Sequence, residues 1–315
     1  MKLGTNHIAI DLGTAYIRIV DSNKGITIEE PSILTYSLTS NEKIAFGDES
    51  KKMIGRTPTH LVVSQPIRGG IITNYDDTTT LLTHLLRKMN KKQKIITKNN
   101  VIVSVASQLT LVEKRAIMEV LLQVGAKKVF PVESSIAAGL GVDLPVWDPR
   151  GFMIVDIGAG KTEAAVLSLG GVVISETCRV GGIIIDDIIQ AHMRIHHNLV
   201  IGSPTAEKIK LNINDIRQTE QDVTQDVKGI DLQSGLPKVI TIYEKELLIP
   251  IIECIMKIVE VIRNVLESTP PELSADIMDT GIVLTGGGAL LTGLDEMISE
   301  RINVPVFLTE NPLHS

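Results

Sequence analysis

Two short segments of this chain share a residue pattern that can hold a phosphate group and a cation. Residues 8–14 read IAIDLGT and residues 153–160 read MIVDIGAG, so each is an apolar run leading into Asp-x-Gly. Glycine lets the main chain approach a phosphate, and consecutive backbone N–H groups supply the donors. The carboxylates of Asp11 and Asp156 can each hold a hydrated divalent cation. One such turn is common in β proteins, but two predict a duplicated domain that holds one nucleotide from both sides.

The elements that must position these carboxylates are two β-hairpins. A second apolar run follows each turn, at residues 17–20 and 164–169, as the returning strand of a hairpin would. A third segment, residues 282–291, reads IVLTGGGALL and predicts a buried strand, a glycine turn and the start of a helix. Three glycines in a row leave bare backbone on which a ligand can lie.

A different phosphate-binding motif, the P-loop, is excluded by spacing. Residues 158–162 read GAGKT and resemble the end of that motif. The full pattern needs a glycine five places before Gly160, and that position holds Val155. A strand is also expected where a P-loop would begin its helix.

The remaining patterns indicate an α/β fold with two small insertions. Residues 101–105 are typical of a buried strand, and residues 109–124 of a helix that ends at a glycine. Residues 32–72 and 182–245 are more polar and predict a small insertion in each half, with an exposed β meander at residues 212–238. Helices covering a mixed sheet are the expected architecture.

Composition limits the function classes. A chain of 315 residues with 43% hydrophobic content can build two domains, and a net charge of −6 argues against a general nucleic-acid binder. Residues 247–266 are apolar but interrupted by charges at amphipathic spacing, which predicts a core helix. Two cysteines fit a reducing cytoplasm. His196 and His197 are expected in a polar turn without ligands at metal-binding spacing, so no transition-metal site is predicted.

With these segments considered together, the chain resembles the actin/Hsp70/sugar-kinase superfamily and, within it, the MreB family of bacterial actins. The resemblance implies an actin-like fold: two related RNase H-like domains, each with a small subdomain, and a nucleotide in the central cleft. The implied subdomains are IA (1–31, 73–144 and 311–315), IB (32–72), IIA (145–181 and 246–310) and IIB (182–245). The segments that carry the resemblance, besides the three above, are residues 29–32, 65–72, 141–147, 168–171, 179–182 and 205–210.

The family resemblance also implies a binding site for ATP or ADP with Mg²⁺, the metal being held by Asp11 and Asp156. Glu207 and Lys210 lie three residues apart on one expected helix face and match the family's ribose and base contacts. Taken alone, this pair would be interpreted as an ordinary surface ion pair. The full set of expected nucleotide-binding residues is Asp11, Gly13, Thr14, Ala15, Tyr16, Asp156, Gly158, Ala159, Gly160, Lys161, Thr162, Gly181, Gly182, Glu207, Lys210, Gly286, Gly287, Gly288 and Leu290.

The expected catalytic positions depart from the family pattern. Where MreB proteins have Glu-Glu-Pro, this chain has Glu133, Ser134 and Ser135, so the carboxylate that orients the attacking water is replaced by a hydroxyl. The family's water-positioning threonine is Lys161, which has no acceptor atom. We therefore expect retained nucleotide binding and weakened hydrolysis, with Glu133 as a weak substitute. These departures resemble divergent MreB paralogues of wall-less helical bacteria.

The resemblance implies a filament-forming protein of the cytoskeleton that supports cell shape or motility. Expected partners are further copies of the chain, possible paralogous actins or other cytoskeletal proteins, and the inner face of the cell membrane. Membrane contact is expected at a basic loop that includes Lys94, Ile95 and Ile96, because each cation near an anionic leaflet contributes about 1 kcal/mol. Two alternatives stay open: an active ATPase of the superfamily, such as a sugar or acetate kinase, and a plasmid-segregation actin.

Overall fold

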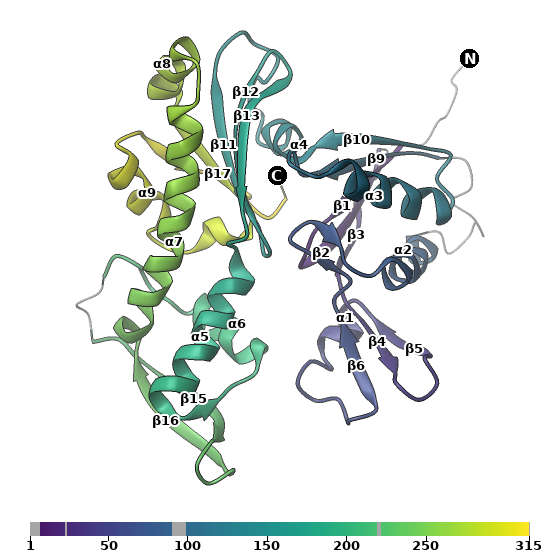
Figure 1. Ribbon diagram of the computed structural model, residues 1–315, viewed down its shortest axis with the longest axis vertical. Coiled ribbons are helices and arrows are strands. Elements are labelled where there is room, and N and C mark those ends of the chain that lie inside the picture. The colour runs from purple at the N-terminus through teal and green to yellow at the C-terminus, as the bar shows by residue number, and fades with distance from the viewer. Residues whose placement is uncertain (1–6, 23, 90–98, 219–221, 315) are drawn as a thin grey trace. The chain divides into compact units, whose positions relative to one another are not determined.

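The computed structural model describes residues 7–22, 24–89, 99–218 and 222–314, and the chain divides into two compact units (Figure 1). The N-terminal unit comprises Met1–Ala137 and the C-terminal unit comprises Ala138–Ser315. Each unit is built on its own five-stranded sheet.

The sheet of the N-terminal unit has the order β10-β9-β1-β2-β3. The first three strands in sequence form an antiparallel meander, whereas β9 and β10 run parallel to β1 and to each other. Strand β1 alternates exposed or half-buried with buried residues, which places Ile8 and Ile10 in the core beside Leu81 and Leu85 of helix α2. The elements are β1 (His7–Leu12), β2 (Tyr16–Asp21), β3 (Gly25–Pro31), β9 (Asn100–Val105), β10 (Lys128–Glu133), α2 (Tyr75–Met89) and α3 (Leu111–Gln123).

The sheet of the C-terminal unit repeats this arrangement with the order β13-β12-β11-β17-β18. Again an antiparallel meander is joined to two parallel strands, so β11 corresponds to β1 and β17 to β9. This shared order confirms the predicted duplication. The elements are β11 (Phe152–Ile157), β12 (Thr162–Ser168), β13 (Gly171–Cys178), β17 (Ile282–Thr285), β18 (Val306–Leu308), α7 (Glu244–Glu267), α8 (Pro271–Thr280), α9 (Leu294–Ile302) and the 3-10 turn η1 (Gly287–Leu290); α4 (Ser134–Gly141) crosses the boundary between the units.

Each unit carries a smaller group of elements inserted in its chain. In the N-terminal unit this group contains β4 (Leu34–Ser37), β5 (Lys43–Phe46), α1 (Asp48–Lys51), β6 (Leu61–Ser64), β7 (Ile67–Arg68) and β8 (Ile71–Ile72). In the C-terminal unit it contains α5 (Gly182–His197), β14 (Leu199–Val200), α6 (Ser203–Leu211), β15 (Thr224–Asp231) and β16 (Pro237–Tyr243). The subdomain bounds given above stay a prediction.

Several local predictions can be compared directly with these elements. The predicted strand at 101–105 is β9, and the predicted core helix at 247–266 is α7. The helix predicted from residue 109 begins two residues later, because Thr110 is its N-cap and forms a capping box with Glu113. The predicted meander at 212–238 is a three-stranded sheet whose main hairpin extends to Tyr243. Placing His196 and His197 in a polar turn was wrong, since both lie in the last turn of α5.

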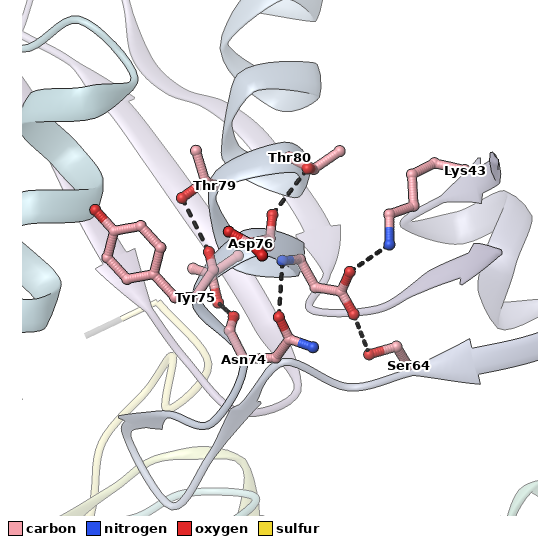
Figure 2. A network of polar contacts seen from close by, with 9 residues as sticks. Lys43, Ser64, Asn74, Tyr75, Asp76, Thr79 and Thr80 are labelled. Carbon is pink, nitrogen blue, oxygen red and sulfur yellow. Dashed lines mark hydrogen bonds and ion pairs between the residues drawn. The ribbon is translucent and has the colours of Figure 1, made fainter. Parts of the chain in front are cut away.

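A buried carboxylate ties the small strands of the N-terminal unit to helix α2 (Figure 2). Asp77 Oδ1 lies 2.5 Å from Lys43 Nζ of β5, and Asp77 Oδ2 accepts a hydrogen bond of 2.8 Å from the Ser64 hydroxyl of β6. Asn74 Oδ1 accepts from the Asp77 backbone N–H at 3.0 Å and so caps the start of α2. Asp77 is only 3% exposed, which makes its partners necessary.

Among the described residues, no helix is both long and apolar enough to cross a lipid bilayer.

Replacing Asp77 with Ala should lower the free energy of unfolding by about 2–4 kcal/mol, because it removes one partner of a buried ion pair and of a buried hydrogen bond. The matched control is Asp76→Ala, on the exposed side of the same helical turn, which should cost about 0.5 kcal/mol through the helix dipole. Urea titrations followed by circular dichroism measure both variants. Equal midpoints for the two would contradict the role assigned to Asp77.

Candidate functional site

In the N-terminal unit, the turn between β1 and β2 is held by its carbonyl groups. Ser32 donates from its hydroxyl to the Gly13 carbonyl at 2.6 Å and from its N–H to the Ala15 carbonyl at 2.9 Å. The Gln65 amide donates to the Thr14 carbonyl at 3.0 Å. In a planar trans peptide the N–H points opposite to the carbonyl, so the N–H groups of Thr14 and Ala15 point away from these partners. The turn therefore presents backbone donors on one side, as an anion site requires.

Glycine is required at the first position of this turn. A Cβ atom at Gly13 would lie 2.5 Å from the carbonyl oxygen of Tyr16, closer than any real contact. The Tyr16 hydroxyl accepts a hydrogen bond of 3.1 Å from Lys51 of α1, so its side chain is anchored within the small group of elements.

Asp11 lies next to the last residue of β1, opposite Arg18 of β2. Its Oδ1 accepts a hydrogen bond of 2.7 Å from Ser104 of β9, and its Oδ2 lies 3.7 Å from the Arg18 guanidinium. Arg18 also pairs with Glu29 of β3 at 2.9 Å. The Asp11 side chain is still 48% exposed, so it is a fixed but accessible carboxylate.

The matching turn of the C-terminal unit has a different charge arrangement. Asp156 of β11 is directly opposite Glu163 of β12, which places two carboxylates on one face of the sheet. Lys161 compensates, because its Nζ lies 2.6 Å from Glu163 Oε2. Glu163 is 1% exposed, so Lys161 serves as a counter-charge for a buried acid in this arrangement. Thr162 is also buried, and its hydroxyl donates to the Val180 carbonyl at 2.8 Å.

Two glycine segments pack against the end of β11. The backbone N–H groups of Gly182 and Ile183 donate to the carbonyls of Gly158 and Ala159, at 3.1 and 2.9 Å. A Cβ at Gly181 would lie 2.6 Å from the Gly158 carbonyl oxygen. From the other side, Gly286 has a φ of 83°, and a Cβ there would lie 2.3 Å from Asp156 Oδ1. The structure thus brings together residues that are far apart in sequence at one end of one strand.

Helix α6 contributes Lys210 to the same region, where it forms an ion pair with α5. Lys210 Nζ lies 2.9 Å from Asp186 of α5 and donates to the Gly182 carbonyl at 2.9 Å. Burial raises the pKa of Asp186 above its usual range, and the nearby charge of Glu207 adds to this effect, whereas Lys210 opposes it. The Lys210 ammonium is therefore placed beside the Gly181–Gly182 turn. Leu290, the last residue of η1, is 47% exposed.

The expected catalytic residues of the N-terminal unit lie at a strand-to-helix junction. Glu133 ends β10 and Ser134 begins α4, while the neighbouring Ser135 is buried with its hydroxyl 3.3 Å from that of Ser107. The expected membrane loop, with Lys94, Ile95 and Ile96, lies outside the described residues.

Sequence reasoning missed the residues that support the turns. Ser32 and Gln65 belong to segments that carried the family resemblance, yet nothing in their spacing indicated that they bond to residues 13–15. Glu163 and Asp186, the partners of Lys161 and Lys210, were also missed. A buried acid inside an apolar run was the only available signal for Glu163.

The residues present fit a phosphate ligand and a hard cation. Each unit places a carboxylate beside a glycine turn, and an added Cβ at Gly13, Gly181 or Gly286 would collide with neighbouring atoms of the chain, so the backbone there carries no side chain. Carboxylate oxygens are the protein ligands that Mg²⁺ prefers. Asp11 in the N-terminal unit and Asp156 in the C-terminal unit are each such a carboxylate.

Comparison with known proteins identifies the family. The MreB/Mbl protein family model matches residues 5–315. The chain is 38% identical to cell shape-determining protein Mbl of Bacillus subtilis over 97% of this chain and 92% of that protein. It is 37% identical to cell shape-determining protein MreB of Escherichia coli K12, over 98% of this chain and 90% of that protein. The crystal structure of MreB5 of Spiroplasma citri bound to AMPPNP is similar with a TM-score of 0.92 and 31% identity, covering 98% and 93% of the two chains. A MamK double helical filament, 20% identical with a TM-score of 0.79 over 98% and 95% of the chains, shares the fold.

Replacing Gly181 with Ala should lower the free energy of unfolding by about 1–3 kcal/mol, because the new Cβ would press on backbone atoms that cannot rotate away. Gly171→Ala is the control, since its Cβ would meet its nearest atom at an ordinary 3.8 Å. Urea titration of the two variants measures the difference. A Gly181→Ala variant as stable as Gly171→Ala would show that the two glycine segments are not closely packed.

Proposed function

Because the chain belongs to the MreB/Mbl family of actin-like proteins, we propose that it binds ATP or ADP with Mg²⁺ and assembles into filaments. The observation that carries this proposal is the repeated site: in each unit an aspartate near the end of the central strand faces a glycine turn. MreB5 of Spiroplasma citri, 31% identical over 98% of this chain, has been seen bound to AMPPNP and to ADP.

Each part of the repeated site has a task in nucleotide binding. The N–H groups of the two turns would hold phosphate oxygens, and Asp11 and Asp156 would hold Mg²⁺. When bound, the metal would neutralise charge on the phosphates. Lys210 and Glu207 would hold the ribose and base, with Lys210 kept in place by Asp186 and the Gly182 carbonyl.

We also propose that hydrolysis is weak. Ser134 carries no charge and cannot remove a proton from water as a carboxylate can. Lys161 has only donor atoms, and its ion pair with Glu163 directs it along the sheet. Neither residue supplies the acceptor that would orient an attacking water, which leaves Glu133 as the nearest carboxylate in sequence.

The proposed setting is the cytoplasm, at the inner face of the cell membrane, in support of cell shape or motility. The proposed partners are further copies of this chain and paralogous actins. Head-to-tail stacking of an actin-like fold is a heterologous contact that does not close, and such contacts generate filaments. Membrane contact through Lys94, Ile95 and Ile96 stays a prediction from sequence.

Filament assembly is tested by sedimentation of the purified chain with ATP and Mg²⁺ over a wide range of protein concentrations. We expect a pelletable fraction above a critical concentration, with filaments visible by electron microscopy. Asp156→Ala is the matched variant, and it should raise the critical concentration by weakening Mg²⁺-nucleotide binding. A monodisperse monomer under every condition would contradict the proposal.

Weak hydrolysis is tested by restoring the family residues. Ser134→Glu combined with Lys161→Thr should raise phosphate release by on the order of 10²–10⁴, with nucleotide affinity changed only a few-fold. Because Lys161→Thr alone removes a counter-charge of buried Glu163, a second version of the pair should also carry Glu163→Gln. Wild-type phosphate release as fast as that of an MreB with the Glu/Thr residues would show that this interpretation of Ser134 and Lys161 is wrong.

A further inference from the structure

A cluster of three metal-ligating side chains lies in the C-terminal unit, where the end of α5 approaches the start of α7. His192 and His197 come from the last two turns of α5, and Glu246 comes from the first turn of α7. One potential ligand atom from each residue lies within 4.8 Å of the other two. No residue expected to bind nucleotide belongs to this cluster.

The geometry leaves one ring nitrogen unused. His197 Nε2 lies 2.8 Å from Glu246 Oε2, at hydrogen-bond distance. His192 Nε2 lies 3.8 Å from the same oxygen, too far for a hydrogen bond. This nitrogen is buried and has no hydrogen-bond partner in the described part of the chain. Because a buried polar atom without a partner costs free energy, the site favours a ligand that His192 can contact.

The carboxylate of Glu246 is held in position by its own helix. Its Oε1 accepts a hydrogen bond of 3.0 Å from the backbone N–H of Tyr243, the N-cap of α7. Oε2 is thereby directed toward the two imidazoles. A second contact that fixes the orientation of a ligand is common around protein metal sites.

The charges around the cluster affect how favourably it would bind a cation. The C-terminal end of a helix dipole favours a cation, and both histidines lie at that end of α5. The charge of Arg194, which is exposed, disfavours a cation nearby. The charge of Lys245, next to Glu246 in the chain, is balanced by Asp222 at 2.5 Å. The ring of His196, an exposed residue, lies next to that of His192, with a centroid distance of 4.4 Å and a tilt of 32° between the ring planes.

We propose that His192, His197 and Glu246 form a binding site for a divalent transition-metal ion of the class that prefers imidazole, with Zn²⁺ as the representative ion. Two histidines and one glutamate are a known zinc ligand set that leaves a fourth position for water. Ligand atoms in a tetrahedral zinc site are about 3.3 Å apart, so small side-chain rotations would close the remaining gap. Binding would replace the proton between His197 and Glu246, and that proton would pass to solvent. The ion would link the end of α5 to the start of α7.

The alternative is that His197 and Glu246 form only a hydrogen bond and that the site binds no metal. The experiment starts from the full chain, stripped of metal with a chelator and dialysed, without nucleotide. Zinc binding is measured by isothermal titration calorimetry, and Co²⁺ is added separately to read the coordination geometry from its visible absorption. We expect one Zn²⁺ per chain with micromolar or tighter affinity. At saturating Zn²⁺ the melting temperature should rise by about 2–8 °C.

Variants assign the ligands. His192→Gln, His197→Gln and Glu246→Gln should each weaken zinc binding at least tenfold and remove the thermal shift. Glutamine at position 246 can still serve the capping box, so loss of binding there would report the lost carboxylate and not an unfolded helix. His196→Gln is the matched control, since it removes the neighbouring histidine that is outside the cluster, and it should bind zinc as the wild type does.

Three outcomes would overturn the proposal. The first is a wild-type chain that takes up no zinc at 100 μM. The second is zinc binding that is equally tight in His192→Gln and His197→Gln. The third is a His196→Gln variant that loses binding while the three cluster variants keep it. Far-UV circular dichroism tests whether each variant is folded. If one cluster variant is unfolded, zinc binding by the other two tests the proposal.

Discussion

In each half of this protein, the arrangement of the glycine turn depends on the central strand, which carries an aspartate near its end. Strands β1 and β11 each pair antiparallel with the next strand in the chain and parallel with a strand from much later. A tight glycine turn connects each central strand to its antiparallel partner, and the parallel partner places a second chain segment at the same edge of the sheet. Ser104 lies next to Asp11 for this reason, and Gly286 lies next to Asp156. The contacts with Ser104 and Arg18 fix the position of the Asp11 carboxylate, which would reduce the entropy lost when a ligand binds.

The two turns share a backbone plan but not a charge balance. Asp11 faces Arg18, whose second partner is Glu29, so a cation lies between two acids across three strands. Asp156 faces Glu163, so two acids are neighbours and the cation comes from Lys161 in the turn itself. Lysine at this position therefore supplies the counter-charge for a buried acid.

Helix α5 connects two chemically distinct regions of the C-terminal unit. Its first residues bond to the carbonyls of Gly158 and Ala159, and its last turns carry the histidines that approach Glu246. The helix is 16 residues long, or about 24 Å. An ion pair of 2.9 Å between Asp186 and Lys210 links the first end of α5 to α6. At the second end, the buried imidazole nitrogen of His192 has no hydrogen-bond partner among the described residues.

The sequence by itself determined the features that local periodicity and turn chemistry control. The two Asp-x-Gly hairpins, the strand before the three glycines, helix α7 and the α/β class all follow from short patterns. The proposed departures from the family pattern at Ser134 and Lys161 were likewise inferred from the sequence. The tertiary structure alone decided which side chains hold the turns and which charges meet. Ser32 reaches Gly13 across 19 positions, Gln65 reaches Thr14 across 51, and His197 reaches Glu246 across 49. Local patterns cannot encode such contacts, because they depend on how separate elements pack. For that reason the sequence placed His196 and His197 in a turn and gave no sign that His192 and His197 approach Glu246.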